Sequence, residues 1–185
     1  IGGIGLIKDY KKMITIDFKD IDNVVLAIGK TEGHIDQSLL SRIILNENNG
    51  PPPEVNLFNE KNNGLTLLNL IEKNFIKSAH DVSLGGIITA ISKMCIKGNK
   101  GIQIKKPKFL INEIEYFFAE DQGRYLIEIN PKDFKEVSKI LDKNSVHYDE
   151  IGKIIDKEMI IDQKTKLTID ELKSYNTNWL KSYMV

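Results

Sequence analysis

The chain has 185 residues, and 26 lysine and arginine residues balance 26 aspartate and glutamate residues, so its formal net charge is zero. A neutral chain lacks the basic field that nucleic acid or an anionic membrane attracts, and we expect neither as a partner. We also find no charged-then-apolar leader and no apolar run near the roughly 20 residues that a membrane span needs. We therefore expect a soluble, cytoplasmic protein.

The first quarter of the chain is predicted to form strands followed by a helix. β-Branched runs at Met13–Phe18 and Asn23–Gly29 predict two neighbouring strands, and the second is expected to be central because its apolar run is nearly unbroken. A polar loop with Gly33 follows. Apolar residues at helical spacing over Leu39–Ile44 then predict a helix with Ser38 as its cap.

Residues Asn46–Asn56 read NENNGPPPEVN, and three consecutive prolines among turn formers predict an extended connector without helix. A helix is expected over Leu57–Phe75 because apolar residues recur at helical spacing. The predicted buried stripe of this helix is Leu65, Leu68, Ile71 and Phe75.

The second half continues the alternation of strands and helices. Gly101–Lys105 and Tyr125–Asn130 are predicted strands, and Pro131 is expected to open a helix at its favoured first position. HYDEIGKII and MIIDQKTKLTI are strand-like, and a closing helix is expected to start at Thr168 or Asp170. This order favours an α/β fold with a mixed β-sheet flanked by helices, formed by residues 1–185 as a single domain.

Two single residues and the start of the chain are also informative. Cys95 is the single cysteine, which rules out an internal disulfide, and its apolar neighbours predict a core residue. Trp179 is expected to anchor the core or a contact with another domain. Because the chain begins at Ile1 with the glycine-rich IGGIG, we expect a fragment of a longer protein.

The stretch SAHDVSLGGIITA (Ser78–Ala90) places two glycines at the expected start of a helix. With Asp81 or Ser83 as N-cap, Gly85 and Gly86 fall in the first turn, where backbone N–H groups lack helical partners. Bare backbone there suits a close approach to an anion or to another piece of backbone. Internal packing against a neighbouring strand is the alternative explanation.

AHDVSLGG resembles the AHDVSDGG segment of the AIR-synthase-related family, and within it the large subunits of the phosphoribosylformylglycinamidine synthases. Further blocks agree in order and spacing. IGGIGLI, GHIDQSLL, NGPPPEVNLFNEKNNG, FFAEDQGRYLIEI and NWLKSYM resemble that family's IGGVGLI, GHLGQS, GxPPPVDLxxEKxxG, FGEDQGRYLV and GWLPxYM. The resemblance covers essentially the whole chain and implies an AIR-synthase-related C-terminal domain.

The resemblance implies a ligase of de novo purine biosynthesis that uses ATP, magnesium and glutamine-derived ammonia to convert formylglycinamide ribonucleotide into the amidine. Such enzymes contain two copies of a paired A and B domain, and this chain looks like the last B domain. The preceding A and B domains, a glutaminase and small accessory subunits are then its partners. Because the family's catalytic groups lie in the A domains, we expect this chain alone to have no catalytic residue, no bound cofactor and no activity. We also expect it to self-associate through the surface that its A-domain partner normally covers.

The resemblance also implies which residues line a substrate or nucleotide cleft. The family's Glu-Ser-Gln contact segment has its counterpart at Glu120, Asp121 and Gln122. The full set of cleft candidates is Asp81, Ser83, Gly85, Gly86, Glu120, Gln122 and Arg124. Arg124 is expected to form an ion pair with Glu120 beside the strand.

At two positions the sequence departs from the family pattern, and both changes make these loops less suited to bind a polar ligand. Asp36 stands where the family has glycine, and its carboxylate would repel a phosphate. Leu84 replaces an aspartate beside Asp81.

The three histidines do not have the close spacing of a metal site, and no metal is expected. A different AIR-synthase-related enzyme, of the selenophosphate synthetase or thiamine-phosphate kinase type, and a purely structural module remain as alternatives.

Overall fold

The computed structural model describes residues 2–105 and 112–184, so Ile1 of the IGGIG block lies outside it. Its strands are β1 (Val24–Ile28), β2 (Ile76–Val82), β3 (Gly101–Ile104), β4 (Arg124–Ile129), β5 (Tyr148–Ile155), β6 (Glu158–Ile161) and β7 (Thr165–Thr168). Its longer helices are α1 (Leu57–Glu72), α2 (Gly86–Gly98), α3 (Glu113–Phe118), α4 (Phe134–Lys143) and α5 (Ile169–Tyr183). Short turns of 3-10 helix, η1 (Tyr10–Lys12) and η3 (Pro131–Asp133), and of π-helix, η2 (Leu40–Leu45), complete the described secondary structure.

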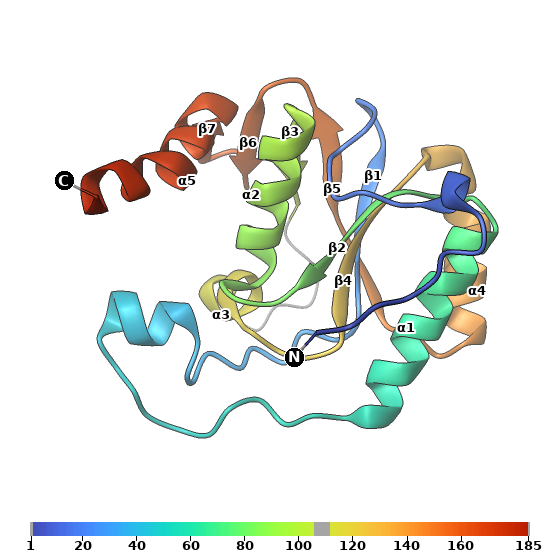
Figure 1. Cartoon of the computed structure of the whole chain (residues 1–185), viewed down its shortest axis with the longest axis horizontal. Coiled ribbons are helices and arrows are strands. Elements are labelled where there is room, and N and C mark those ends of the chain that lie inside the picture. Colours follow the sequence, from blue (N-terminus) through green and yellow to red (C-terminus); the bar gives the residue numbers. More distant parts are fainter. Residues whose placement is uncertain (1, 106–111, 185) are drawn as a thin grey trace.

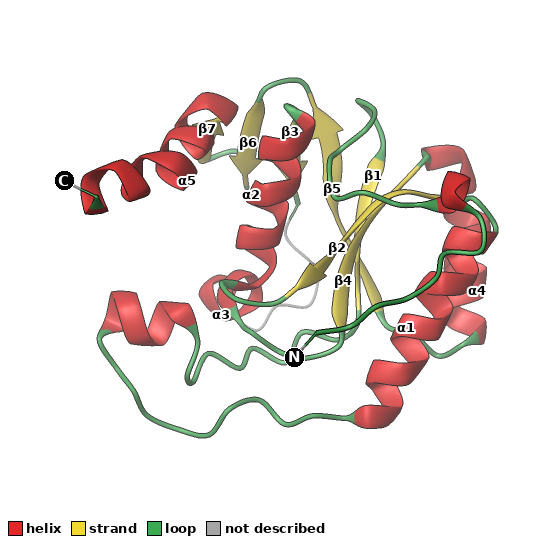
Figure 2. Ribbon diagram, in the orientation of Figure 1, coloured by secondary structure: helices red, strands yellow, loops and turns green. Residues whose placement is uncertain are grey.

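Within the described residues, seven strands form one mixed sheet in the order β2-β4-β1-β5-β3-β6-β7 (Figure 1). Neighbouring strands are antiparallel except for β3 and β6, which run parallel. Helices lie on both sides of the sheet (Figure 2), with α1 and α4 together on one side and α2 and α3 on the other. The predicted α/β class with a mixed, helix-flanked sheet is confirmed.

Each face of the sheet has its own apolar core. On one face α2 and α3 bury residues such as Ile91, Met94 and Phe117 against the sheet, and on the other α1 and α4 bury Leu70 and Leu141. Cys95 belongs to the first core, is fully buried, and burial raises the pKa of its thiol to about 12. The prediction of a core cysteine is confirmed.

The predicted strand over Met13–Phe18 is wrong. This segment lies beside the edge strand β2 and shares one bond with it, from the Ala79 nitrogen to the Thr15 oxygen at 3.2 Å. Just beyond it, the buried carboxylate of Glu128 accepts the backbone N–H groups of Lys19 and Asp20 at 2.9 and 3.0 Å. The Glu128 side chain on β4 therefore fixes the backbone directly after this segment.

Helix α1 is confirmed, but it ends at Glu72 and its predicted buried stripe is partly wrong. Leu65 and Leu68 are 55% and 58% exposed, whereas Leu67 and Leu70 pack against the sheet. The helix turns this way because polar Asn63 points inward, where its amide donates to the Gly123 oxygen at 2.9 Å. An inward polar residue is invisible to a pattern of apolar spacing.

The remaining helix predictions agree more closely with the structure. The helix predicted over Leu39–Ile44 is a π-helical turn, η2, whose N-cap is Leu39 rather than the predicted Ser38. The Ser38 hydroxyl nevertheless accepts the Ser41 N–H in the first turn at 3.2 Å. Pro131 opens η3, which leads into α4, and Thr168 caps α5 in a capping box. Trp179 on α5 is 60% exposed, so its prediction as a core anchor is wrong, and a contact with another domain remains a prediction.

Candidate functional site

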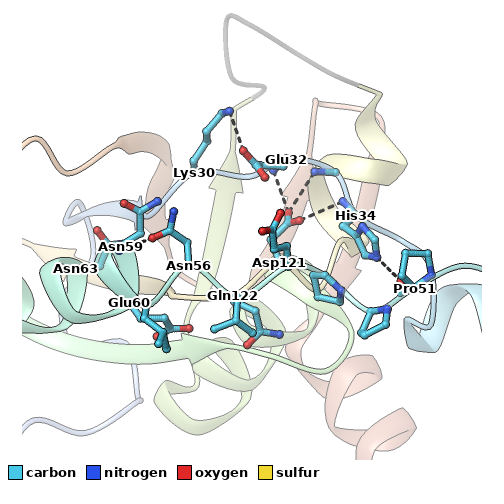
Figure 3. Close-up of a pocket in the computed structure, with 16 residues that line it drawn as sticks. Lys30, Glu32, His34, Pro51, Asn56, Asn59, Glu60, Asn63, Asp121 and Gln122 are labelled. Carbon is cyan, nitrogen blue, oxygen red and sulfur yellow. Dashed lines mark hydrogen bonds and ion pairs between the residues drawn. The ribbon is translucent and has the colours of Figure 1, made fainter.

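A pocket of about 980 Å³ opens where the loop after β1, the proline-rich connector and the start of α1 meet (Figure 3). The connector reaches this place because its three prolines keep it extended up to Asn56. Asn56 then caps α1 by accepting the Asn59 N–H at 3.0 Å. The lining residues that the argument uses are Lys30, Glu32, His34, Glu54, Glu60 and Gln122, together with Asn56, Asn63 and Asp121.

Asp121 forms one wall of the pocket and is 7% exposed. Its carboxylate accepts the consecutive backbone N–H groups of Glu32, Gly33 and His34, at 3.0, 3.2 and 3.2 Å. A run of three N–H groups around one point is the arrangement that binds anions in many proteins. Here the chain supplies the anion itself.

Arg124 is buried behind this wall and hydrogen-bonds the backbone that carries Asp121. Its guanidinium is buried and donates to the backbone oxygens of Asp121 and Ala119 at 3.1 and 2.7 Å and to the Thr31 hydroxyl at 3.0 Å. It also lies 3.8 Å from the Asp121 carboxylate, and burial lowers its pKa from the ordinary value. The predicted ion pair with Glu120 is wrong, because Arg124 pairs with Asp121 instead.

Glu120 joins two other segments. One of its carboxylate oxygens, Oε1, accepts the N–H groups of Leu39 and Gly85, each at 2.8 Å. Glu120 therefore ties the start of η2 to the start of α2.

The loop after β1 is also fastened to the proline-rich connector. The His34 ring nitrogen Nε2 donates to the Pro51 oxygen at 2.8 Å, and the Gln37 amide donates to the Gly50 oxygen at 3.1 Å. Gly50 leaves room for the Asp36 carboxylate, which packs directly against it. Asp36, which departs from the family pattern, thus contacts the connector.

Of the seven cleft residues predicted from sequence, Gln122 lines the pocket, while Glu120 and Arg124 hold its surroundings from outside the lining. Asp81 lies on β2 and Ser83 follows it, both exposed and outside the pocket lining. The predicted cap by Asp81 or Ser83 is wrong, because Gly85 is the N-cap of α2 and no side chain caps it by the usual local bond.

A close contact within the domain explains why residue 86 is a glycine. Its φ is +70°, and a Cβ there would lie 2.5 Å from the Phe117 oxygen and 2.7 Å from the Ala119 oxygen. Both atoms belong to the end of α3, so the close approach of bare backbone expected from sequence is made within this domain. Internal packing thus accounts for Gly86, although the neighbouring backbone is the end of α3 and not the strand that was expected.

Sequence reasoning missed Lys30, Asn56, Glu60 and Asn63 as pocket residues. A usable signal was the run of prolines that ends in an asparagine N-cap, because it fixes where α1 begins. His80 and Asp81, which are neighbours on β2, contact through Nδ1 and Oδ1 at 3.0 Å, and the other ring nitrogen of His80 is buried with no partner among the described residues.

Residues 2–105 and 112–184 contain neither a metal-binding cluster nor a membrane-spanning helix. No three histidine, cysteine, aspartate or glutamate residues there gather closely enough to hold a metal ion. No helix in that part of the chain is both long and apolar enough to cross a membrane.

The fold and the pocket define an α/β domain with a mixed sheet, helices on both faces and a polar cleft beside the proline-rich connector. The model of the family "AIR synthase related protein, C-terminal domain" matches residues 20–163, and the chain belongs to this family. The resemblance found in the sequence is confirmed.

Curated relatives match along the whole chain. It is 65% identical over 184 residues to the phosphoribosylformylglycinamidine synthase subunit PurL of Pelagibacter ubique and 35% identical to that of Bartonella henselae. In both comparisons all of this chain is covered and 25% of the relative. The chain thus spans about a quarter of the length of these relatives.

Solved structures share the fold at low identity. PurL of Thermotoga maritima complexed with FGAR superposes with a TM-score of 0.76 and 16% identity, over 88% of this chain and 30% of that one. HypE of Escherichia coli, a hydrogenase maturation protein, gives a TM-score of 0.61 and 14% identity over 84% of this chain and 52% of that one. These likenesses show the fold alone.

Proposed function

We propose that this chain is the C-terminal domain of a phosphoribosylformylglycinamidine synthase, the ligase that forms the amidine from formylglycinamide ribonucleotide with ATP, magnesium and glutamine-derived ammonia. The observation that carries the proposal is the 65% identity to the Pelagibacter ubique subunit over the whole chain. The Thermotoga maritima relatives complexed with FGAR and with ATP are consistent with it.

The partners in this proposal are the preceding A and B domains of the same polypeptide, together with a glutaminase and small accessory subunits, in the cytoplasm. The chain has exposed apolar side chains that suit such contacts. They lie on the outer side of α1 at Phe58, Leu65 and Leu68 and on α5 at Trp179 and Tyr183. Without its partner domains, the chain is expected to self-associate through such surfaces.

The role of the domain in the enzyme is structural in this proposal. Glu120 and Asp121 already occupy five backbone N–H groups in the segments that resemble ligand-contacting loops. These five donors are not available to a substrate phosphate. The chain alone is expected to show no synthase activity, because the family's catalytic groups lie in the A domains. A thiamine-monophosphate kinase shares the fold at only 13% identity, and this likeness does not favour the thiamine-phosphate kinase alternative.

A chimera tests the proposal. The segment of the Pelagibacter ubique subunit that aligns with this chain is replaced by residues 1–185, and the product is assayed for amidine formation and for rescue of a purine auxotroph. The matched controls are the intact subunit and the subunit lacking the segment. Activity near that of the intact subunit supports the proposal, whereas a folded but inactive chimera contradicts it.

A further inference from the structure

The helix α5 packs against the domain through its first turn and then leaves it. Ile169 and Leu172 are 4% and 8% exposed and belong to the core that α2 covers. Every residue from Ser174 to Met184 is exposed, and Figure 1 shows this part of the helix projecting away from the sheet. We call residues 174–184 the α5 arm.

The apolar side of α5 continues from the core onto the arm. Its members are three and four positions apart, which places them on one side of the helix, and they are Leu172, Tyr175, Trp179 and Tyr183. Leu172 is buried, whereas Tyr175, Trp179 and Tyr183 are 76%, 60% and 80% exposed. Tyrosine and tryptophan are enriched where proteins bind one another. An apolar stripe that begins in the core and continues outside it is typical of a surface that a partner covers.

The opposite side of the arm has its polar groups satisfied within the helix. The Thr177 hydroxyl donates to the Lys173 oxygen at 2.9 Å. The Asn178 amide donates to the Ser174 hydroxyl at 2.7 Å. This side of the arm needs no partner, so the aromatic stripe is the side that a partner would contact.

The arm also lacks the local signals of a helix that is stable by itself. Residues 174–178 read SYNTN, and serine, tyrosine, asparagine and threonine all have weaker helix propensity than alanine, leucine or lysine. Short helices that pack against nothing are marginal in water. We therefore expect the amides of the arm to exchange quickly in the isolated chain, and a stable helix there to require packing against another surface.

We propose that the α5 arm docks in an apolar groove on another domain of the same polypeptide, with Trp179 and Tyr183 inserted, and becomes a stable helix on docking. This inference rests on the proposed function, in which the chain is one domain of a longer synthase. The relatives that match the whole chain are about four times as long, since it covers 25% of each, so most of such a polypeptide is available as the partner. The charged residues of α5 from Lys173 onward are Lys173 and Lys181, so the receiving groove is not basic.

Hydrogen exchange measured by mass spectrometry tests the docking. The isolated chain is compared with the chimera described above, each at a low and a high protein concentration. We expect peptides from the arm to exchange more slowly in the chimera by about tenfold or more, at both concentrations. Equal exchange in the chimera and the isolated chain would overturn the proposal. Protection that appears in the isolated chain as its concentration rises would identify a second copy as the occupant and would also overturn it.

Two variants separate docking from the intrinsic stability of the helix. The double variant Trp179→Ala, Tyr183→Ala should leave the urea midpoint of the isolated chain unchanged, because both side chains are exposed there. In the chimera it should return the exchange of the arm to the rate of the isolated chain. Thr177→Ala, on the opposite side of the helix, is the matched control and should keep the protection. Equal loss of protection in the control and the double variant would contradict docking through the aromatic stripe.

The exchange measurement also distinguishes this inference from the proposed function. A folded chimera that lacks activity but protects the arm would contradict the proposed function and support docking. An active chimera whose arm exchanges as in the isolated chain would support the proposed function and overturn docking.

Discussion

The carboxylate of Glu120 lies 2.8 Å from the backbone nitrogen of Gly85 and accepts its hydrogen bond. The same oxygen accepts the N–H of Leu39 at 2.8 Å. Three segments that are distant in sequence thus meet at one side chain: the start of η2, the start of α2 and the end of α3. The glycines at the start of α2 are part of this junction, since Gly86 lets the helix approach the carbonyl groups of α3.

Replacing the charge at this junction should destabilise the domain. In Glu120→Gln a neutral amide oxygen replaces a carboxylate, and hydrogen bonds to a charged group contribute more than neutral ones. We expect the free energy of unfolding to fall by about 1–2 kcal/mol, measured by urea denaturation. Glu136→Gln, on exposed α4, is the control and should change stability by less than about 0.5 kcal/mol. Equal changes in the free energy of unfolding for the two variants would show that Glu120 does not stabilise this junction.

Gly86→Ala should be more damaging. The added methyl group would lie 2.5 Å from the Phe117 oxygen, on a residue whose φ is +70°. A left-handed conformation costs a non-glycine residue about 1–2 kcal/mol, and overpacking typically adds about 1–3 kcal/mol. We therefore expect a loss of about 2–5 kcal/mol in thermal or urea unfolding.

Gly64→Ala is the matched control for that variant. Gly64 lies inside α1, and the nearest atom to an added Cβ is the Tyr125 hydroxyl oxygen at an ordinary 3.6 Å. Alanine has the higher helix propensity, so stability should rise by about 0.5–1 kcal/mol. If Gly86→Ala behaves like Gly64→Ala, the glycine is not required by internal packing.

His147 should give the domain a pH dependence near neutrality. The Asp149 carboxylate lies 3.5 Å from its Nε2, and this interaction raises the pKa of His147 above its ordinary 6.5. The folded state then holds the proton more tightly than the unfolded state. The stabilising contribution is complete below pH 6.5 and is lost as the pH rises through the folded pKa.

An NMR titration of the His147 ring protons measures this directly. We expect a midpoint above 6.5 in the natural chain and a lower midpoint in Asp149→Asn, which removes the charged partner. A midpoint that does not move in the variant shows that Asp149 is not the cause.

The sequence was sufficient for features that depend on local patterns. The central strand β1, the helix that Pro131 opens and the capping box at Thr168 all follow from residues close in the chain. The alternation of strand-like and helical segments predicted the fold class, and the blocks of family resemblance indicated an AIR-synthase-related domain. These signals need no knowledge of which segments become neighbours in space.

Features that depend on distant partners were not predicted. The Asp121 carboxylate reaches N–H groups nearly ninety positions earlier in the chain, and no spacing rule connects them. The buried face of α1 was misassigned because inward Asn63 bonds to the Gly123 oxygen, sixty positions away. Sequence patterns treat both side chains as solvent-exposed, and only the folded arrangement supplies their partners.

The strand predicted over Met13–Phe18 leads to the last prediction, because Glu128 organises the chain that follows it. This fully buried carboxylate accepts hydrogen bonds from the N–H groups of Lys19 and Asp20, from the Asn23 amide at 2.7 Å and from the Ser78 hydroxyl at 2.7 Å.

In Glu128→Gln an NH₂ group replaces one of the two accepting oxygens, so it faces donors and leaves them unsatisfied. A buried unsatisfied group costs about 1–3 kcal/mol, and at least one of the two pairs of donors is affected, so we expect a loss of about 3 kcal/mol or more in urea unfolding. Ser78→Ala removes a single donor and is the graded comparison, with an expected loss of about 1–2 kcal/mol. Hydrogen exchange should show the amides of Lys19 and Asp20 losing protection in Glu128→Gln and keeping it in Ser78→Ala. Unchanged protection of both amides in Glu128→Gln would show that the segment is held by other contacts.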